Sequence, residues 1–178
     1  MAKEVKLHIG ILLATVLACF IWVNTPELNR FSLQLSAMLL LFLLISHRFQ
    51  TPRTFKLTQS ITSTIAVIFI TTSTGTLASP LFFINSLLLF ELSILLEPII
   101  PIVLAFTLIL FYFNLGNSQG SVFSYAVLFS LPLVTPLAYF LGRLYQKVTN
   151  QKKEIHNLSE KVEELKEELI EEELNHNL

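Results

Sequence analysis

The sequence predicts an all-α fold, in which a polytopic membrane domain of about six transmembrane helices is followed by a cytoplasmic coiled-coil helix. Three observations support this prediction. Hydrophobic residues make up 53% of the 178 residues and charged residues only 14%, unlike the composition of a soluble domain. Apolar runs of near-membrane length recur up to about residue 142. The rest of the chain is highly charged and carries an apolar heptad repeat.

The end of the last apolar run divides the chain into a transmembrane helical domain, 1–142, and a coiled-coil tail, 143–178. A hydrocarbon core about 30 Å thick requires roughly 20 helical residues. Some of the runs are shorter than this, and others are long enough to cross. The expected spans are 7–23, 31–46, 57–73, 81–96, 99–113 and 121–142.

The run from 81 to 113 is too long for a single crossing, because one straight helix of this length would extend about 50 Å. Pro98 and Pro101 mark the place where it should fold back, since proline removes a backbone donor and disfavours helix in the residue before it. The two halves form either two thin spans, which we favour, or a re-entrant hairpin.

The first apolar run, 7–23, admits two interpretations. As a span, it carries Gly10, Ala14 and Ala18 at four-residue spacing, which would let another helix approach closely. As a signal sequence, it would be cleaved before Cys19, because the preceding residues resemble a bacterial lipoprotein processing box. The apolar sequence continues beyond that point, which favours the span.

Lysine and arginine are concentrated on one side of the predicted spans, and this bias predicts the orientation. The opposite loops contain only Arg30. We therefore expect a multi-pass protein of the cell inner (plasma) membrane with both termini in the cytoplasm. The basic residues on the inner side are Lys3, Lys6, Arg48, Arg53, Lys56, Arg143, Lys147, Lys152 and Lys153.

The heptad repeat after Leu141 predicts an oligomerisation seam that continues directly from the last span. Each heptad contributes two seam positions. Beta-branched residues at the first position (Val148, Ile155 and Val162) and leucine at the second (Leu158 and Leu165) favour two parallel helices. The seam residues are Val148, Ile155, Leu158, Val162, Leu165 and Leu169.

The charges beside the seam leave the identity of its partner open. At a few tenths of a kcal/mol for each exposed pair, like charges in a parallel homodimer would cost about 1 kcal/mol. Burial of each seam residue contributes up to about 1.5 to 3 kcal/mol before the entropy cost is subtracted. The free energy of association should therefore favour a homodimer by a small margin. The alternatives are a different coiled-coil protein with acids opposite Lys161 and Lys166, or a solitary amphipathic helix. The like pairs are Lys147 with Lys152, Lys161 with Lys166, and Glu168 with Glu173.

Glu91 and Glu97 are the candidate intramembrane polar site, because they are the only charged residues between 81 and 113. A carboxylate in the hydrocarbon region costs about 2.5 to 3.5 kcal/mol, so such residues are often functional. Glu91 could serve a small proton- or ion-coupled transporter or channel. Alternatively, it is protonated and held by hydroxyls of a neighbouring helix, while Pro98 places Glu97 at the inner interface.

The sequence shows no sign of catalysis, of a cofactor, of a metal site or of nucleic-acid binding. Zinc-protease, nucleophile-elbow and phosphate-loop motifs do not occur, and no basic stripe with interleaved aromatic residues is present. The four histidines are too scattered for a metal site by spacing. They are His8, His47, His156 and His176. We expect membrane lipid and a helical protein as the partners.

Thr74 and Gly75, followed by Ser79, Pro80 and 81–83, precede a leucine-rich run. This pattern resembles the Thr-Gly-Gly…Ser-Pro-Phe segment of the membrane-embedded N-terminal sensor modules of bacterial histidine kinases and diguanylate cyclases. The second glycine of that pattern is replaced by threonine here, and the kinase or cyclase domain has no counterpart in this sequence. The resemblance therefore implies a membrane sensor or scaffold module without an enzymatic role.

Overall fold

The computed structural model describes residues 2–46, 48–116 and 122–176, and these residues form helices and connecting turns without a strand. The all-α prediction is therefore confirmed. The helices are α1 (Ala2–Asn24), α2 (Pro26–Asn29), α3 (Ser32–Ser46), α4 (Pro52–Ser73), the 3-10 helix η1 (Thr76–Ala78), α5 (Ile84–Leu95), α6 (Ile100–Gly116) and α7 (Val122–His176).

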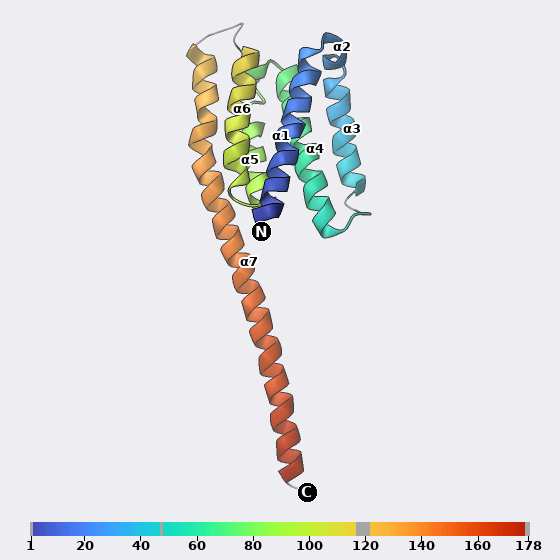
Figure 1. The fold of residues 1–178 in the computed structure, drawn as a ribbon, viewed down its shortest axis with the longest axis vertical. Helices are drawn as coiled ribbons and strands as arrows, with labels where there is room; N and C mark the ends of the chain where they lie inside the picture. Colours follow the sequence, from blue (N-terminus) through green and yellow to red (C-terminus); the bar gives the residue numbers. More distant parts are fainter. Residues whose placement is uncertain (1, 47, 117–121, 177–178) are drawn as a thin grey trace. The chain divides into compact units, whose positions relative to one another are not determined.

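The chain forms two compact units, Met1–Gly142 and Arg143–Leu178. Helix α7 contributes to both units, because the boundary between them falls within it. It also contains Pro132 and Pro136. Within the first unit, successive long helices alternate in direction (Figure 1). The start of α1, the α3–α4 loop and the α5–α6 turn consequently lie at the same end of this unit.

The long helices lie close to the expected runs, although their ends differ by a few residues. Helix α4 begins at Pro52 rather than at 57, so part of the basic segment between the second and third expected spans is helical. Proline is favoured in the first turn, where its missing N–H has no helical acceptor to lose. The segment 24–30, between the first two expected spans, contains the one-turn helix α2, which also begins with a proline, Pro26.

The long run from 81 to 113 is interrupted near the prolines. Helix α5 ends at Leu95, and α6 begins at Ile100 and packs against it. The 12 residues of α5 extend about 18 Å, less than the thickness of a hydrocarbon core. The two-span and re-entrant alternatives both contain this break.

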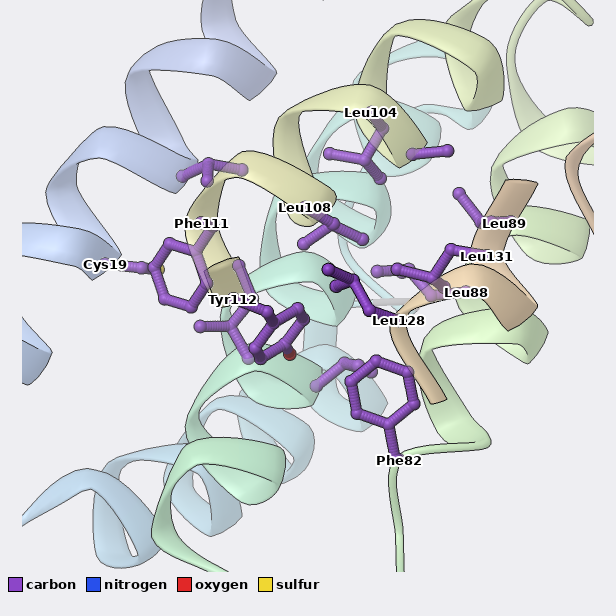
Figure 2. Packing of buried hydrophobic residues seen from close by; sticks show 14 of the residues in the cluster. Cys19, Phe82, Leu88, Leu89, Leu104, Leu108, Phe111, Tyr112, Leu128 and Leu131 are labelled. Carbon is purple, nitrogen blue, oxygen red and sulfur yellow. The ribbon is translucent and has the colours of Figure 1, made fainter. Parts of the chain in front are cut away.

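Helix α4 is central to the first unit, since it packs against α1, α3 and α5. The apolar core combines leucine from α5 and α6 with aromatic residues (Figure 2). The ring of Tyr112 lies 5.2 Å from that of Phe82 and 5.1 Å from that of Phe111, in edge-to-face arrangements. The contact with Phe82 holds the turn before α5 against α6, whereas Phe111 and Tyr112 are neighbours within α6.

Among the described residues, two helical segments are long and apolar enough to cross a membrane, Val5–Asn24 and Tyr125–Leu169. Three further helices are apolar but shorter, namely α3, α5 and α6. Helix α4 has sufficient length, but its Thr, Ser and Gln residues make it less apolar. Six helices thus correspond in position to the six expected spans, and two of them meet the requirements of both length and composition.

Candidate functional site

Glu91, on α5, contacts two polar side chains of α4. Its Oε1 atom accepts a hydrogen bond of 2.8 Å from Nε2 of Gln59 and one of 3.0 Å from Oγ of Ser63. Gln59 and Ser63 are four residues apart, so they lie on the same face of α4. A hydroxyl partner for Glu91 was among the expectations from the sequence, whereas the carboxamide of Gln59 was not. Together these donors offset part of the cost of placing a carboxyl group in an apolar domain.

Glu97 lies in the interruption between α5 and α6, away from the regular part of either helix. Its backbone carbonyl accepts a 2.9 Å hydrogen bond from the N–H of Ile100, at the start of α6. This contact places Glu97 in the turn that reverses the chain. Of the two expected acidic residues, Glu91 is therefore the one that links neighbouring helices through its side chain.

A second polar cluster, formed by Thr71, Asn85 and Tyr112, was not predicted from the sequence. All three side chains are fully buried. The Tyr112 hydroxyl donates to Oδ1 of Asn85 at 3.0 Å, and Nδ2 of Asn85 donates to Oγ1 of Thr71 at 3.3 Å and to the carbonyl of Phe82 at 3.0 Å. Because the carboxamide donors and acceptor are satisfied, the cluster joins α4, α5 and α6 as a structural element.

The residues that carry the resemblance to sensor modules build the turn between α4 and α5. The hydroxyls of Thr74 and Ser79 are hydrogen-bonded at 2.5 Å, and Oγ of Ser79 accepts a 3.1 Å hydrogen bond from the N–H of Leu81. Gly75 has a φ of +124° and Thr76 a φ of +56°. The second glycine of the pattern therefore corresponds to a position with left-handed backbone, which is costly for a β-branched residue.

Replacing Thr76 with glycine is expected to stabilise the protein by about 0.5 to 1 kcal/mol. Relief of left-handed strain is worth roughly 1 to 2 kcal/mol, and the additional entropy of glycine in the unfolded chain offsets about half of this gain. The measurement is the free energy of unfolding in detergent micelles. Gly75→Ala is the matched control and should destabilise, because an added Cβ is strained at φ +124°. A destabilising Thr76→Gly would contradict the assigned turn.

The second unit presents the predicted seam on an isolated helix. The heptad spacing places these side chains along one face of the helix. Each of these residues is between 49% and 66% exposed, far more than the seam residues of a paired coiled coil would be. The exposed seam residues are Val148, Ile155, Leu158, Val162, Leu165 and Leu169.

The stripe of small residues on α1 is not covered by another helix within the described part of the chain. A Cβ added to Gly10 would have no neighbouring atom within 4 Å. Ala14 and Ala18 line an open groove of about 510 Å³ between α1, α3 and α4. The free Cys19 lies in the uninterrupted α1 and is buried. The close helix contact expected from the stripe is thus absent from this part of the molecule.

Searches against family models, curated proteins and solved structures returned no match for this chain. Within the described residues, no group of three or more His, Cys, Asp or Glu side chains is placed to hold a metal ion. The features of the described residues that bear on function are therefore the exposed apolar surface, the contacts of Glu91 and the seam of α7.

Proposed function

We propose that this chain is a multi-pass protein of the cell inner (plasma) membrane, and a non-catalytic sensor or scaffold module whose tail oligomerises or binds a partner. The observation that carries the proposal is α7, which is assigned as one helix from the apolar first unit into the exposed seam. Because the heptads follow the last apolar run in the sequence without an intervening linker, a displacement of that run would be passed on to the tail.

The surface of α3 supports the membrane part of the proposal. Its buried residues are Ser32, Ser36 and Ser46. Soluble proteins bury the apolar face of a helix, whereas membrane helices often pack through small and polar residues and turn their apolar side chains to lipid. The exposed apolar side chains of α3 are Leu33, Met38, Leu40, Leu41, Phe42, Leu44 and Ile45.

The two segments that are long enough to cross a membrane give the same indication. Only 17% of the most apolar window of Val5–Asn24 and 28% of that of Tyr125–Leu169 is buried. The core helix of a soluble protein would be mostly buried. Exposed apolar surface of this extent favours contact with lipid.

The direction of the helices in the first unit supports the proposed orientation. The start of α1, the α3–α4 loop and the α5–α6 turn share one end (Figure 1). Most lysines and arginines near the apolar runs belong to the segments at this end, whereas Arg30 belongs to an opposite loop. The positive-inside rule therefore favours a cytoplasmic N-terminus.

Specific contacts attach the first part of α7 to α5. The hydroxyl of Ser93 donates to the backbone carbonyl of Ala138. A Cβ at Gly142 would lie only 2.7 Å from the carbonyl oxygen of Ser93 and 3.3 Å from Cβ of Pro98, so the two segments approach closely at this glycine. A rearrangement of α5 would therefore displace the part of α7 that contacts it.

Crosslinking in native membranes tests this proposal. Cys19→Ser removes the only native thiol, and a single cysteine is then introduced by Ile155→Cys or Val162→Cys. We expect a crosslinked homodimer, or recovery of a helical partner when the full chain is purified. Asn157→Cys, on the opposite face of the heptad, is the matched control. The proposal is wrong if the seam captures neither its own copy nor another protein.

The contacts of Glu91 favour a second candidate, a small proton- or ion-coupled transporter or channel. A carboxyl group beside Gln59 and Ser63 provides oxygen atoms between two helices of an apolar domain. For this candidate, Glu91→Gln in proteoliposomes should lower ion or proton flux at least about tenfold. Glu97→Gln serves as the control, because Glu97 lies in a turn. Flux that is unchanged from wild type, relative to empty liposomes, would remove this candidate.

A further inference from the structure

We propose that the seam of α7 binds a helix of a different protein whose apolar stripe is flanked by acidic residues. These acids would face Lys147, Lys152, Lys161 and Lys166. The inference rests on the proposed function, and it specifies the chemistry of the partner.

The four lysines form two matched pairs along the flanks of the seam. Lys147 and Lys161 directly precede Val148 and Val162 in the chain, so they lie on one flank. Lys152 and Lys166 occupy the other flank at the same two-heptad spacing. All four are exposed in the isolated tail helix. A helix docked on the seam would meet positive charge on both sides over two heptads.

A second copy of this chain is a poor match for that pattern. In a parallel pair, Lys147 faces Lys152 and Lys161 faces Lys166, and the twofold symmetry repeats each contact. The intervening flank pair, Glu154 with Ser159, provides no compensating attraction.

Self-association in the opposite orientation is disfavoured by the way the tail is joined to the chain. Two copies in one membrane have the same orientation, and their tails begin at the same level. Because no linker separates the last apolar run from the heptads, the two tails leave the membrane side by side and are expected to pair in parallel. The parallel arrangement is the one that opposes like charges.

A partner with acidic flanks converts these repulsions into attractions. Glutamate opposite each lysine gives the arrangement found between the flanks of specific coiled coils. Lysine opposite Glu154 and Glu168 would complete the match. Such a partner would also resist pairing with itself, since its own flanks would place acid against acid.

Binding of two synthetic helical peptides to the full chain in nanodiscs tests the inference. Both peptides carry the same isoleucine and leucine seam. The first has glutamate facing the four lysines and lysine facing Glu154 and Glu168, whereas the control peptide has the tail's own charges at these positions. We expect the first peptide to bind at least about tenfold more tightly, and the ratio to fall as salt is raised. Replacing all four lysines with glutamate should invert the preference.

The possible outcomes distinguish failure of this inference from failure of the proposed function. Equal binding of the two peptides, or tighter binding of the control, overturns the acidic partner but keeps a tail that associates. Efficient crosslinking of two copies at Ile155, with neither peptide bound, has the same meaning. If neither peptide binds and no crosslink forms at the seam, the inference and the proposed function both fail.

Discussion

Replacing both Ile155 and Val162 with aspartate is expected to abolish association through the tail. Each side chain is more than half exposed in the isolated helix and would be buried in a paired one. Loss of two apolar contacts, at about 1.5 kcal/mol or more each, weakens binding by more than about 100-fold. Burial of the new carboxylates adds a further penalty. The measurement is the fraction of crosslinked or co-purified complex in membranes.

The double substitution of Asn150 and Asn157 by aspartate is the matched control for this experiment. It adds the same charge on the face opposite the seam, and neither pair of substitutions changes helix propensity much. Association should remain within about threefold of wild type, the range of weak surface electrostatic effects. If the control and the seam variant lost binding equally, the tail would act through its charge or its helicity, and the assigned seam would be wrong.

Gly142→Ala is expected to destabilise the first unit by about 1 to 3 kcal/mol, the usual cost of overpacking. The new Cβ would be 2.7 Å from the carbonyl oxygen of Ser93, which belongs to the backbone and has little freedom to move. Separation of α5 and α7 would also weaken the hydrogen bond between Ser93 and Ala138. The measurement is the free energy of unfolding in detergent micelles, followed by circular dichroism.

Gly10→Ala is the control for this substitution, and its expected effect has the opposite sign. A Cβ at Gly10 meets no atom within 4 Å, so alanine should stabilise α1 by about 0.5 to 1 kcal/mol through helix propensity. Equal effects of the two substitutions would mean that α5 and α7 do not approach closely at Gly142.

The positions of the helices could be predicted from the sequence because apolar runs, prolines and heptads are local signals. The interruption near Pro98 and the helical conformation of the tail are examples. The start of α4 at Pro52 was missed, since basic residues suggested a loop whereas the proline is well suited to the first helical turn. The one-turn helix α2 was missed because so short a segment has no periodicity to detect.

The polar contacts between helices could not be predicted, because they depend on which helix faces meet. Glu91 stood out as a charge in an apolar run, but nothing local pointed to Gln59 and Ser63, 32 and 28 residues away. Asn85 did leave a signal, since it is the only carboxamide between 81 and 113. Its pairing with Tyr112 requires the packing of α5 against α6, which the sequence alone did not supply.

The polar character of α4 has a consequence for how the proposed membrane domain is made. The carboxamide of Gln59 and the hydroxyl of Ser63 donate to Glu91 of α5, which is synthesised later, whereas other hydroxyls such as that of Thr71 donate to carbonyls of α4 itself. Until Glu91 emerges from the ribosome, α4 would carry the Gln59 carboxamide into lipid without this partner. Biogenesis should therefore deliver α4 to the bilayer together with α5 rather than by itself.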